Sequence, residues 1–419
     1  MSDLDLSTYD PMARSVQQNP FPFYAELRRR APVFRHPKTG MYFVSTLAAV
    51  NQVLAAPEIY SSQFANVPTL PSGPVRDEMR KILSKAVPPV NTMLTADPPL
   101  QTRYRKTVGR AFSTRRILAL EPRIRELCSD LISRWPARGR VPFHDEFAVL
   151  FPVRVISYAL NMKSEVEGRI KPWSDDSVAA LGVEIDDARR LEAARGIVEL
   201  QQYWVSEFED RRAHPRDDFL TDLAKAEFED ETGAVRLLSI PELLSIIAQL
   251  MVAGNETTTK LLNETVRLLI ENPAEWKRIQ QDPATIPAMV EEALRLSTPN
   301  QGMFRVARRD TELAGVPIPK GSMLWIMFGS ANRDERTFPD PDRFDPTRGN
   351  LREHVAFGRG AHFCIGAPLS RLEVRVAFEE LVKRVDRISF APGQTFEYEP
   401  SYILRGLKTL SIDVEKKPS

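Results

Sequence analysis

The chain has 419 residues, 42% of them hydrophobic and 27% charged, and its formal net charge is +1. This composition is ordinary for a globular enzyme, and the length allows either two domains or one large domain. The balanced charge gives no reason to expect a nucleic acid or an anionic membrane as partner. Two cysteines far apart, Cys128 and Cys364, do not make a disulfide framework, so the sequence predicts a reducing, cytoplasmic compartment.

The sequence shows no signal peptide and no membrane span. Residues 1–15 lack a charged segment followed by an apolar one. The longest apolar run, residues 243–254, is about half as long as a membrane span requires. We therefore expect this run to lie in a buried helix.

The N-terminal third mixes helices with short strands, and the middle of the chain is helical. Residues 33–45 have Gly40 between two apolar runs, as a β-hairpin would. A proline break then precedes a helix, for which Asp97 is a plausible cap. From there to about residue 230, apolar residues recur at spacings of three and four, which predicts helices.

The longest predicted helix begins after Ser239. Ser239 and Glu242 match a capping box, and nothing interrupts the helix before Pro273. A second helix covers residues 286–297, and after Thr298 short strand-like runs separated by glycine and proline follow. A glycine-rich loop, one more helix and a strand-like tail complete the chain. The sequence thus predicts a mainly α fold with minor β-structure and no internal repeat.

Cys364 lies in a glycine-rich loop, "FGRGAHFCIGAPLSRLE", at residues 357–373. A buried structural thiol is the default for a lone cysteine. A zinc site needs about four ligands, and only His354 and His362 lie nearby. A cysteine nucleophile paired with His362 would lack a third, orienting group. The remaining alternative is a thiolate ligand of haem iron, which needs a thin loop with backbone N–H groups near the sulfur.

The composition of the loop is compatible with a haem thiolate. Gly358, Gly360 and Gly366 allow the main chain to approach closely, and Phe357 is able to shield the sulfur from water. Cys128, by contrast, has apolar neighbours at helical spacing, so we expect it in the core.

Residues 253–259, "AGNETTT", lie inside the long predicted helix, although glycine and threonine are poor helix formers. One interpretation is a bend in which threonine hydroxyls bond to carbonyls one turn earlier. The other is a local opening of the helix beside a ligand, with Glu256 and Thr257 handling protons, since a buried carboxylate is costly unless it is used or paired. The residues alone do not decide between the two.

Glu292 and Arg295 lie three residues apart on the next predicted helix, and a solvent-exposed ion pair is the default interpretation. Residues 331–348 are rich in proline, aspartate and arginine, and we expect an ordered polar meander there. Alone, neither feature specifies a function.

Together, and in this order, these motifs resemble the cytochrome P450 superfamily, most closely its soluble bacterial members. The resemblance rests on "FGRGAHFCIG" before a helix, "AGNET" on a long helix and "EALR" before a meander, and it covers essentially the whole chain. It implies the P450 fold, a helix-rich core around a haem with small β-sheets. Residues 1–419 would form a single haem domain, with a β-rich N-terminal part and a helix-rich C-terminal part.

The resemblance implies haem b as cofactor, with Cys364 as the ligand of its iron. It also implies that Glu292, Arg295 and Arg348 form a buried polar network supporting the haem-binding core. Gln101 stands where the family usually has histidine, but an amide still donates to a propionate. The residues expected to bind the cofactor are Cys364, His362, Arg305, Arg105, Gln101, Phe357, Gly358, Gly366 and Ala253.

The resemblance further implies a monooxygenase that inserts one oxygen atom of O2 into a C–H bond. Thr257 and Glu256 would deliver protons to bound dioxygen, with glutamate in place of the commoner aspartate, and Ser370 replaces the usual alanine with no function attached. Because the chain has no flavin-binding extension, two electrons would come from a ferredoxin and its NAD(P)H-dependent reductase. The basic residues expected to dock this carrier, or to form an ordinary solvated cluster, are Arg105, Lys106, Arg110 and Arg359.

The expected substrate is a lipophilic small molecule such as a terpenoid, steroid, fatty acid or aromatic compound. The residues expected to line its pocket are Met93, Leu94, Gln249, Val252, Gln301, Met303, Tyr402 and Ile403. Two alternatives stay open: oxidative coupling or desaturation on the same fold, and a non-catalytic haem sensor, against which the Glu256–Thr257 pair argues. We expect a monomer.

Overall fold

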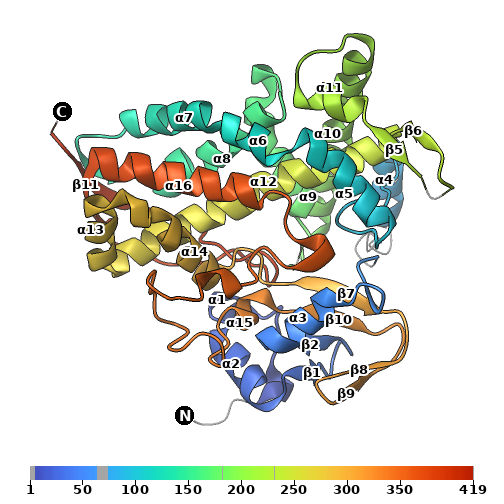
Figure 1. Ribbon diagram of the computed structural model, residues 1–419, viewed down its shortest axis with the longest axis horizontal. Helices are drawn as coiled ribbons and strands as arrows, with labels where there is room; N and C mark the ends of the chain where they lie inside the picture. The colour runs from blue at the N-terminus through green and yellow to red at the C-terminus, as the bar shows by residue number, and fades with distance from the viewer. Residues whose placement is uncertain (1–4, 64–73, 182, 231, 419) are drawn as a thin grey trace.

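The computed structural model describes residues 5–63, 74–181, 183–230 and 232–418. In Figure 1, helices fill the upper part of the molecule, and a sheet with short helices beside it occupies the lower part. This is the helix-rich fold with small separate sheets that the sequence predicts.

The α-helices are α1 (Arg14–Gln18), α2 (Phe21–Arg30), α3 (Leu47–Ala55), α4 (Pro74–Leu83), α5 (Leu100–Ala111), α6 (Thr114–Ala119), α7 (Glu121–Ser133), α8 (Leu150–Ala159), α9 (Glu167–Val178), α10 (Asp187–Ala213), α11 (Phe219–Ala224), α12 (Ile240–Glu271), α13 (Pro273–Gln281), α14 (Ile286–Ser297), α15 (Phe328–Ala331) and α16 (Ala367–Arg384). The shorter helical segments are η1 (Leu6–Thr8), η2 (His144–Val149), η3 (Ser164–Val166), η4 (Pro283–Thr285), η5 (Leu351–Glu353) and η6 (Gly360–His362). The strands are β1 (Val33–Arg35), β2 (Tyr42–Val44), β3 (Tyr60–Ser61), β4 (Arg138–Val141), β5 (Glu227–Glu229), β6 (Val235–Leu237), β7 (Met303–Ala307), β8 (Thr311–Leu313), β9 (Val316–Ile318), β10 (Met323–Ile326), β11 (Val385–Phe390) and β12 (Ile412–Lys416).

The largest sheet combines distant parts of the chain. Its strand order is β1-β2-β10-β7-β3. β1 and β2 pair antiparallel with Val33 opposite Val44, so the predicted hairpin is confirmed. β10 lies parallel to β2, with Leu324 opposite Tyr42, and antiparallel to β7. The β-structure is therefore not confined to the N-terminal part, because β7 and β10 come from residues 303–326.

α12 runs through the helical part for 32 residues, which is about 48 Å. The predicted capping box of Ser239 and Glu242 is present, and the helix ends at Glu271, ahead of Pro273. α14 covers residues 286–297, as the sequence predicts. The long helix is thus correctly bounded by its local signals.

The predicted cap of α5 is wrong. α5 begins at Leu100 after Pro99, and no side chain caps it. The Asp97 carboxylate instead accepts from Ser61 Oγ at 2.5 Å and from the Ser62 N–H at 2.8 Å. Asp97 therefore joins the end of β3 to the start of α5, a contact that local spacing does not reveal.

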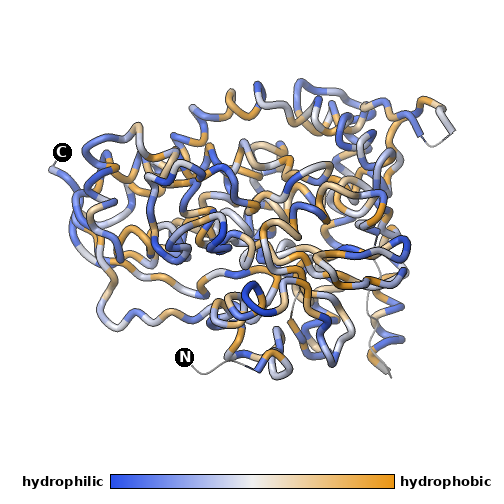
Figure 2. Tube along the Cα trace, turned by 60° about the horizontal axis from the view of Figure 1, so that its bottom comes forward, coloured by the Kyte–Doolittle hydropathy of each residue, from blue (hydrophilic) through white to orange (hydrophobic). Residues whose placement is uncertain are grey.

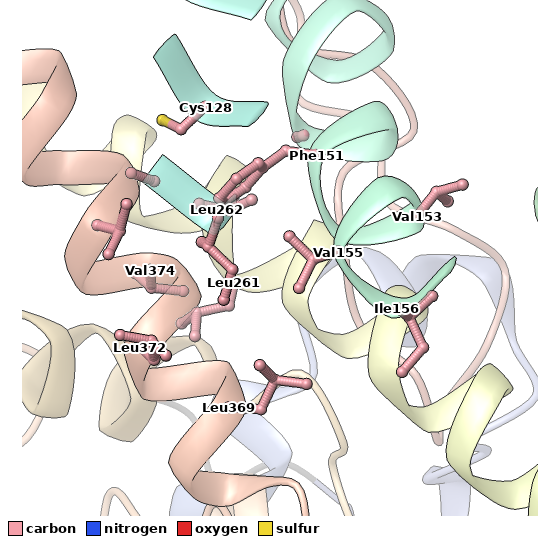
Figure 3. Packing of buried hydrophobic residues seen from close by; sticks show 14 of the residues in the cluster. Cys128, Phe151, Val153, Val155, Ile156, Leu261, Leu262, Leu369, Leu372 and Val374 are labelled. Carbon is pink, nitrogen blue, oxygen red and sulfur yellow. The ribbon is translucent and has the colours of Figure 1, made fainter. Parts of the chain in front are cut away.

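Apolar side chains from α7, α8, α12 and α16 form the main core, which Figure 3 shows from close by. Cys128, Phe151 and Leu262 meet there. Cys128 is fully buried, as predicted, and burial raises the pKa of its thiol. A Cβ on Gly254 would lie 2.8 Å from Ile156 Cδ1, so this glycine lets α8 approach α12 closely.

Within the described ranges, no helix combines the length and the apolar character that crossing a membrane requires. Figure 2 shows hydrophobic and hydrophilic residues alternating along the helices. Even α12, the longest, has Glu242, Glu256 and Lys260 among its buried residues.

Candidate active site

Cys364 lies beyond a tight turn that glycines permit. Gly358 and Gly360 have φ angles of 65° and 67°, in the left-handed region that other residues rarely adopt. A Cβ on Gly360 would also lie 2.8 Å from the Leu54 carbonyl oxygen. The Cys364 N–H donates to the Phe357 carbonyl at 2.9 Å, which closes the loop.

Backbone N–H groups and cations surround the sulfur. Burial raises the pKa of the Cys364 thiol. Hydrogen bonds from the N–H groups of Gly366 and Ala367 lower this pKa. The positive charges of Arg105 and Arg371 lower it as well. These groups stabilise a thiolate, which is the form that a metal ion binds.

The donors around Cys364 do not suit zinc. Among the described residues, no group of three or more His, Cys, Asp and Glu side chains is placed to hold a metal ion. His354 Nε2 lies 3.0 Å from Glu291 Oε2, and His362 Nε2 lies 3.1 Å from Ser62 Oγ, so both imidazoles have other partners. A single thiolate, as haem iron takes, fits this arrangement.

Three nitrogen donors gather beside the loop. Arg305 on β7 is 5% exposed, and burial lowers its pKa to about 10. Arg105 on α5 is half-buried, and no carboxylate of the described residues pairs with it. Burial lowers the pKa of His362 to about 4, and the charges of Arg305 and Arg105 add to this. The carboxylate that acts on Arg305, that of Asp97, already pairs with Arg308.

These donors fit a group that carries two carboxylates. Buried cations are costly unless an anion compensates them. Haem propionates are such anions, so the residues present suit the cofactor that a lone thiolate would ligate.

Gln101 supports the cysteine loop. Its Nε2 donates to the Ala361 carbonyl at 2.6 Å, and the residue is 1% exposed. This bond ties α5 to η6, next to His362. The structure therefore gives Gln101 a loop contact that the sequence did not predict.

Glu292, Arg295 and Arg348 form one buried network. Arg295 donates to the two Glu292 oxygens at 2.7 and 2.8 Å, and Arg348 Nε donates at 3.0 Å. The Glu292 and Arg295 side chains are both 0% exposed, so the interpretation as a solvent-exposed pair is wrong. Arg295 also donates to the carbonyls of Asn332 and Pro341, which fixes the polar meander against α14.

The middle of α12 is unbroken. Thr257 Oγ1 donates to the Ala253 carbonyl at 2.9 Å, one turn earlier. This is the back-bonding that the first interpretation of residues 253–259 describes, and the local opening is absent. Thr257 itself is partly exposed.

Glu256 is held by two lysines. Lys260 Nζ, one turn later on α12, donates to Glu256 Oε2 at 2.8 Å, and Lys171 Nζ of α9 lies 3.3 Å from Oε1. Burial alone would raise the pKa of Glu256, but the two ammonium groups outweigh it and lower the pKa to about 2. Lys171 also pairs with the more exposed Asp175, so the cluster extends towards the surface.

Four of the predicted pocket residues lie on α12 or on the loop beside it. Gln249 Nε2 donates to Thr92 Oγ1 at 2.9 Å, and its Oε1 accepts from the Leu94 N–H at 3.2 Å. These bonds hold the loop that carries Met93 against α12, with Val252 three residues further on. The Gln249 amide therefore positions the loop.

The other predicted pocket residues lie on segments other than α12, and most of them contact the N-terminal part of the chain. Gln301 donates to a main-chain carbonyl at 2.6 Å and accepts from Tyr24 Oη at 3.3 Å. Tyr402 packs against two aromatic rings, and Ile403 is 2% exposed in the cluster of the N-terminal helices. Met303 lies partly buried on β7. The C-terminal tail thus folds onto the N-terminal segment, which no local pattern indicates.

Several charged residues of the site were not predicted from the sequence. Lys260 had a usable signal, because it follows Glu256 by four residues on one helix. The pairing of Lys171 with Glu256 and that of Arg371 with Glu291 had none, because each joins two distant segments.

Known proteins resemble this chain over nearly its full length. The family model described as "Cytochrome P450" matches residues 187–395. The chain is 33% identical to the vitamin D(3) 25-hydroxylase of Pseudonocardia autotrophica over 96% of both chains. It is 35% identical to the erythromycin C-12 hydroxylase of Saccharopolyspora erythraea over 87% of this chain and 86% of that one. Its fold is similar to that of cytochrome P450 CYP109Q5 from Chondromyces apiculatus, with a TM-score of 0.86, 33% identity and coverage of 99% of this chain and 100% of that one.

Proposed function

The chain belongs to the cytochrome P450 family, and from this premise we propose that it is a haem-thiolate monooxygenase in which Cys364 ligates the iron. The observation that carries the proposal is the loop with its single cysteine beside Arg105 and Arg305, two arginines that form no ion pair with a carboxylate of the described residues. The enzyme would insert one oxygen atom of O2 into a C–H bond of a lipophilic small molecule.

The chain's residues would hold haem b in two ways. Cys364 would supply the thiolate, whose negative charge the N–H groups of Gly366 and Ala367 favour against the burial that raises the pKa of the thiol. Arg305, Arg105 and His362 would donate to the propionates, whose negative charge would compensate the buried cations. When bound, the haem supplies O2 activation, which a thiolate ligand favours.

Thr257 and Glu256 would move the protons that the reaction consumes. The Thr257 hydroxyl is a donor with the Ala253 carbonyl as its present acceptor, so a rotation about one bond would redirect it. Glu256 pairs with Lys171, which also pairs with the more exposed Asp175, so this charged cluster reaches from the buried middle of α12 towards solvent. Positioned proton donors of this kind contribute rate factors of roughly 10²–10⁴.

Relatives named for hydroxylating vitamin D(3) and erythromycin support hydroxylation over coupling or desaturation. They also support a steroid-like or macrolide substrate among the lipophilic classes. We further propose that a ferredoxin and its NAD(P)H-dependent reductase supply electrons to a cytoplasmic monomer. The exposed Lys106 and Arg110 of α5 would attract an acidic carrier.

A panel of steroids and macrolides tests the proposal through the absorption spectrum of the haem-loaded protein. We expect some members to shift the haem to the high-spin state and to be hydroxylated with label from ¹⁸O2 when a surrogate ferredoxin and reductase are added. Spin-state shifts without oxygen incorporation would favour the sensor alternative. Label-free desaturated or coupled products would favour the other alternative.

A further inference from the structure

Phe357 is the first residue of the cysteine loop. Its ring lies against polar side chains that have no part in the proposed reaction. The Arg371 guanidinium lies over the Phe357 ring, with its Cζ 4.6 Å from the ring centre. The His354 ring centre lies 6.3 Å from the same ring. Arg371 comes from α16 and His354 from the segment before the loop, so two parts of the chain meet at this phenylalanine.

Glu291 of α14 ties these two side chains together. Arg371 Nε and Nη2 donate to its two carboxylate oxygens at 2.5 and 2.9 Å, and His354 Nε2 lies 3.0 Å from Oε2. The Glu291 side chain is 13% exposed. Because a bidentate pair fixes the plane of a guanidinium, Arg371 cannot turn away from the Phe357 ring without breaking two bonds.

The main chain connects this cluster to the sulfur. The Ala356 N–H donates to His354 Nδ1 at 3.2 Å, which holds the residue next to Phe357. The Phe357 carbonyl accepts from the Cys364 N–H at 2.9 Å. A shift of Phe357 would therefore be transmitted to Cys364 through a single hydrogen bond.

We propose that Glu291, Arg371 and His354 form a clamp that positions Phe357 beside Cys364 and so keeps the thiolate on the iron. This inference rests on the proposed ligation by Cys364. The three are positioning residues that act through Phe357 and the loop, in addition to the direct effect of the Arg371 charge on the Cys364 thiol. A cation–π contact contributes only about 0.5–2 kcal/mol, but groups that orient a metal ligand alter metal affinity or activity by about 10–100-fold.

Arg371→Met tests the clamp, and Arg375→Met is its matched control. Arg375 lies one turn later on α16 and pairs with Glu121 at 2.6 Å and Glu379 at 2.8 Å. The two arginine side chains are similarly exposed, at 36% and 28%. Each substitution therefore removes one guanidinium with two carboxylate bonds from the same helix, but only Arg371 touches Phe357.

The measurement is the decay of the thiolate-type absorption band of the reduced, carbon monoxide-bound protein. We expect the band to decay about tenfold faster in Arg371→Met, and also faster in Glu291→Gln, than in wild type. Arg375→Met should decay as wild type does. Decay of Arg371→Met at the rate of Arg375→Met, with a normal wild-type band, would overturn the clamp and leave the ligation intact. A wild type without the band would instead overturn the ligation.

The haem-free proteins separate positioning from general stability. Arg371→Met and Arg375→Met should lower the unfolding temperature of the haem-free chain by similar amounts, because each loses a comparable ion pair. A larger drop for Arg371→Met, in proportion to its faster band decay, would mean that Arg371 merely stabilises the fold.

Discussion

The loop around Cys364 and the middle of α12 satisfy their polar groups in different ways. In the loop, left-handed glycines and main-chain bonds, such as that from the Cys364 N–H to the Phe357 carbonyl, fix the backbone. In α12, the backbone is a regular helix, and side-chain contacts satisfy the polar groups: Thr257 donates to the Ala253 carbonyl, and two lysines hold Glu256. The loop is therefore fixed by its main chain, whereas the middle of α12 depends on side-chain contacts that single substitutions can remove.

The largest effect is expected for a substitution in the cysteine loop. Cys364→Ala should abolish the thiolate-type carbon monoxide band and all product formation, because no second thiolate lies within the loop. Cys128→Ala is the control: it removes a core thiol and should cost only a few kcal/mol or less of unfolding free energy. A thiolate-type band that persists in Cys364→Ala would refute the assignment of the ligand.

The second-largest effect is expected when the buried carboxylate of Glu292 on α14 is removed. Glu292→Ala leaves Arg295 and Arg348 buried without an anion, which should destabilise the protein by about 3–5 kcal/mol and impair haem retention. Urea unfolding and haem content measure the two effects. Glu126→Ala, which breaks an exposed pair with Arg123, should cost less than about 1 kcal/mol. Equal losses in both variants would contradict a special role for the buried network.

On the α12 side, Thr257→Ala should leave the band intact and uncouple electron use from product formation. Loss of a positioned proton donor should reduce product per NAD(P)H by roughly 10²-fold. Thr265→Ala is the matched control, because Thr265 Oγ1 makes the same type of bond, to the Leu261 carbonyl at 2.7 Å. Coupling that is unchanged in Thr257→Ala would refute the proton-delivery role.

The smallest expected effect concerns the pH dependence of stability. The pKa of Glu256 is lowered from 4.5 to about 2, so its ion pairs stabilise the fold above about pH 4.5 and are lost as the pH falls towards 2. Between pH 7 and pH 4 this amounts to about 1 kcal/mol of unfolding free energy.

Glu256→Gln should remove that contribution. We expect it to be less stable than wild type at pH 7, because Lys260 loses its anion and Lys171 keeps only Asp175, and to lose less stability between pH 7 and pH 4. Urea unfolding at the two pH values measures the difference. A pH dependence identical to that of wild type would show that other carboxylates account for it.

Local signals predicted several elements well. The capping box at Ser239, the boundaries of residues 286–297 and the hairpin at residues 33–45 depend on neighbours within a few residues, and all three are confirmed. The prediction that Asp97 caps a helix is wrong because its partners, Ser61 among them, lie in another segment. Capping propensity describes what a side chain can do, but here the Ser61 hydroxyl and the Ser62 N–H are the donors from which the Asp97 carboxylate accepts.

The residues of the candidate site also differ in whether local sequence or tertiary contacts identified them. The residues alone marked Cys364 and the Glu256–Thr257 pair as unusual for a loop and a helix, whereas the Glu292–Arg295 pair was singled out only by the resemblance to the family. The resemblance predicted that the Glu292–Arg295 pair is buried, and the tertiary structure confirms it, whereas the local spacing alone favoured an exposed pair. Only the tertiary structure decided that two lysines hold Glu256 and that Gln249 and Gln301 use their amides within the protein. Burial and pairing depend on contacts between distant segments of the chain, and composition and residue spacing do not predict which segments contact each other.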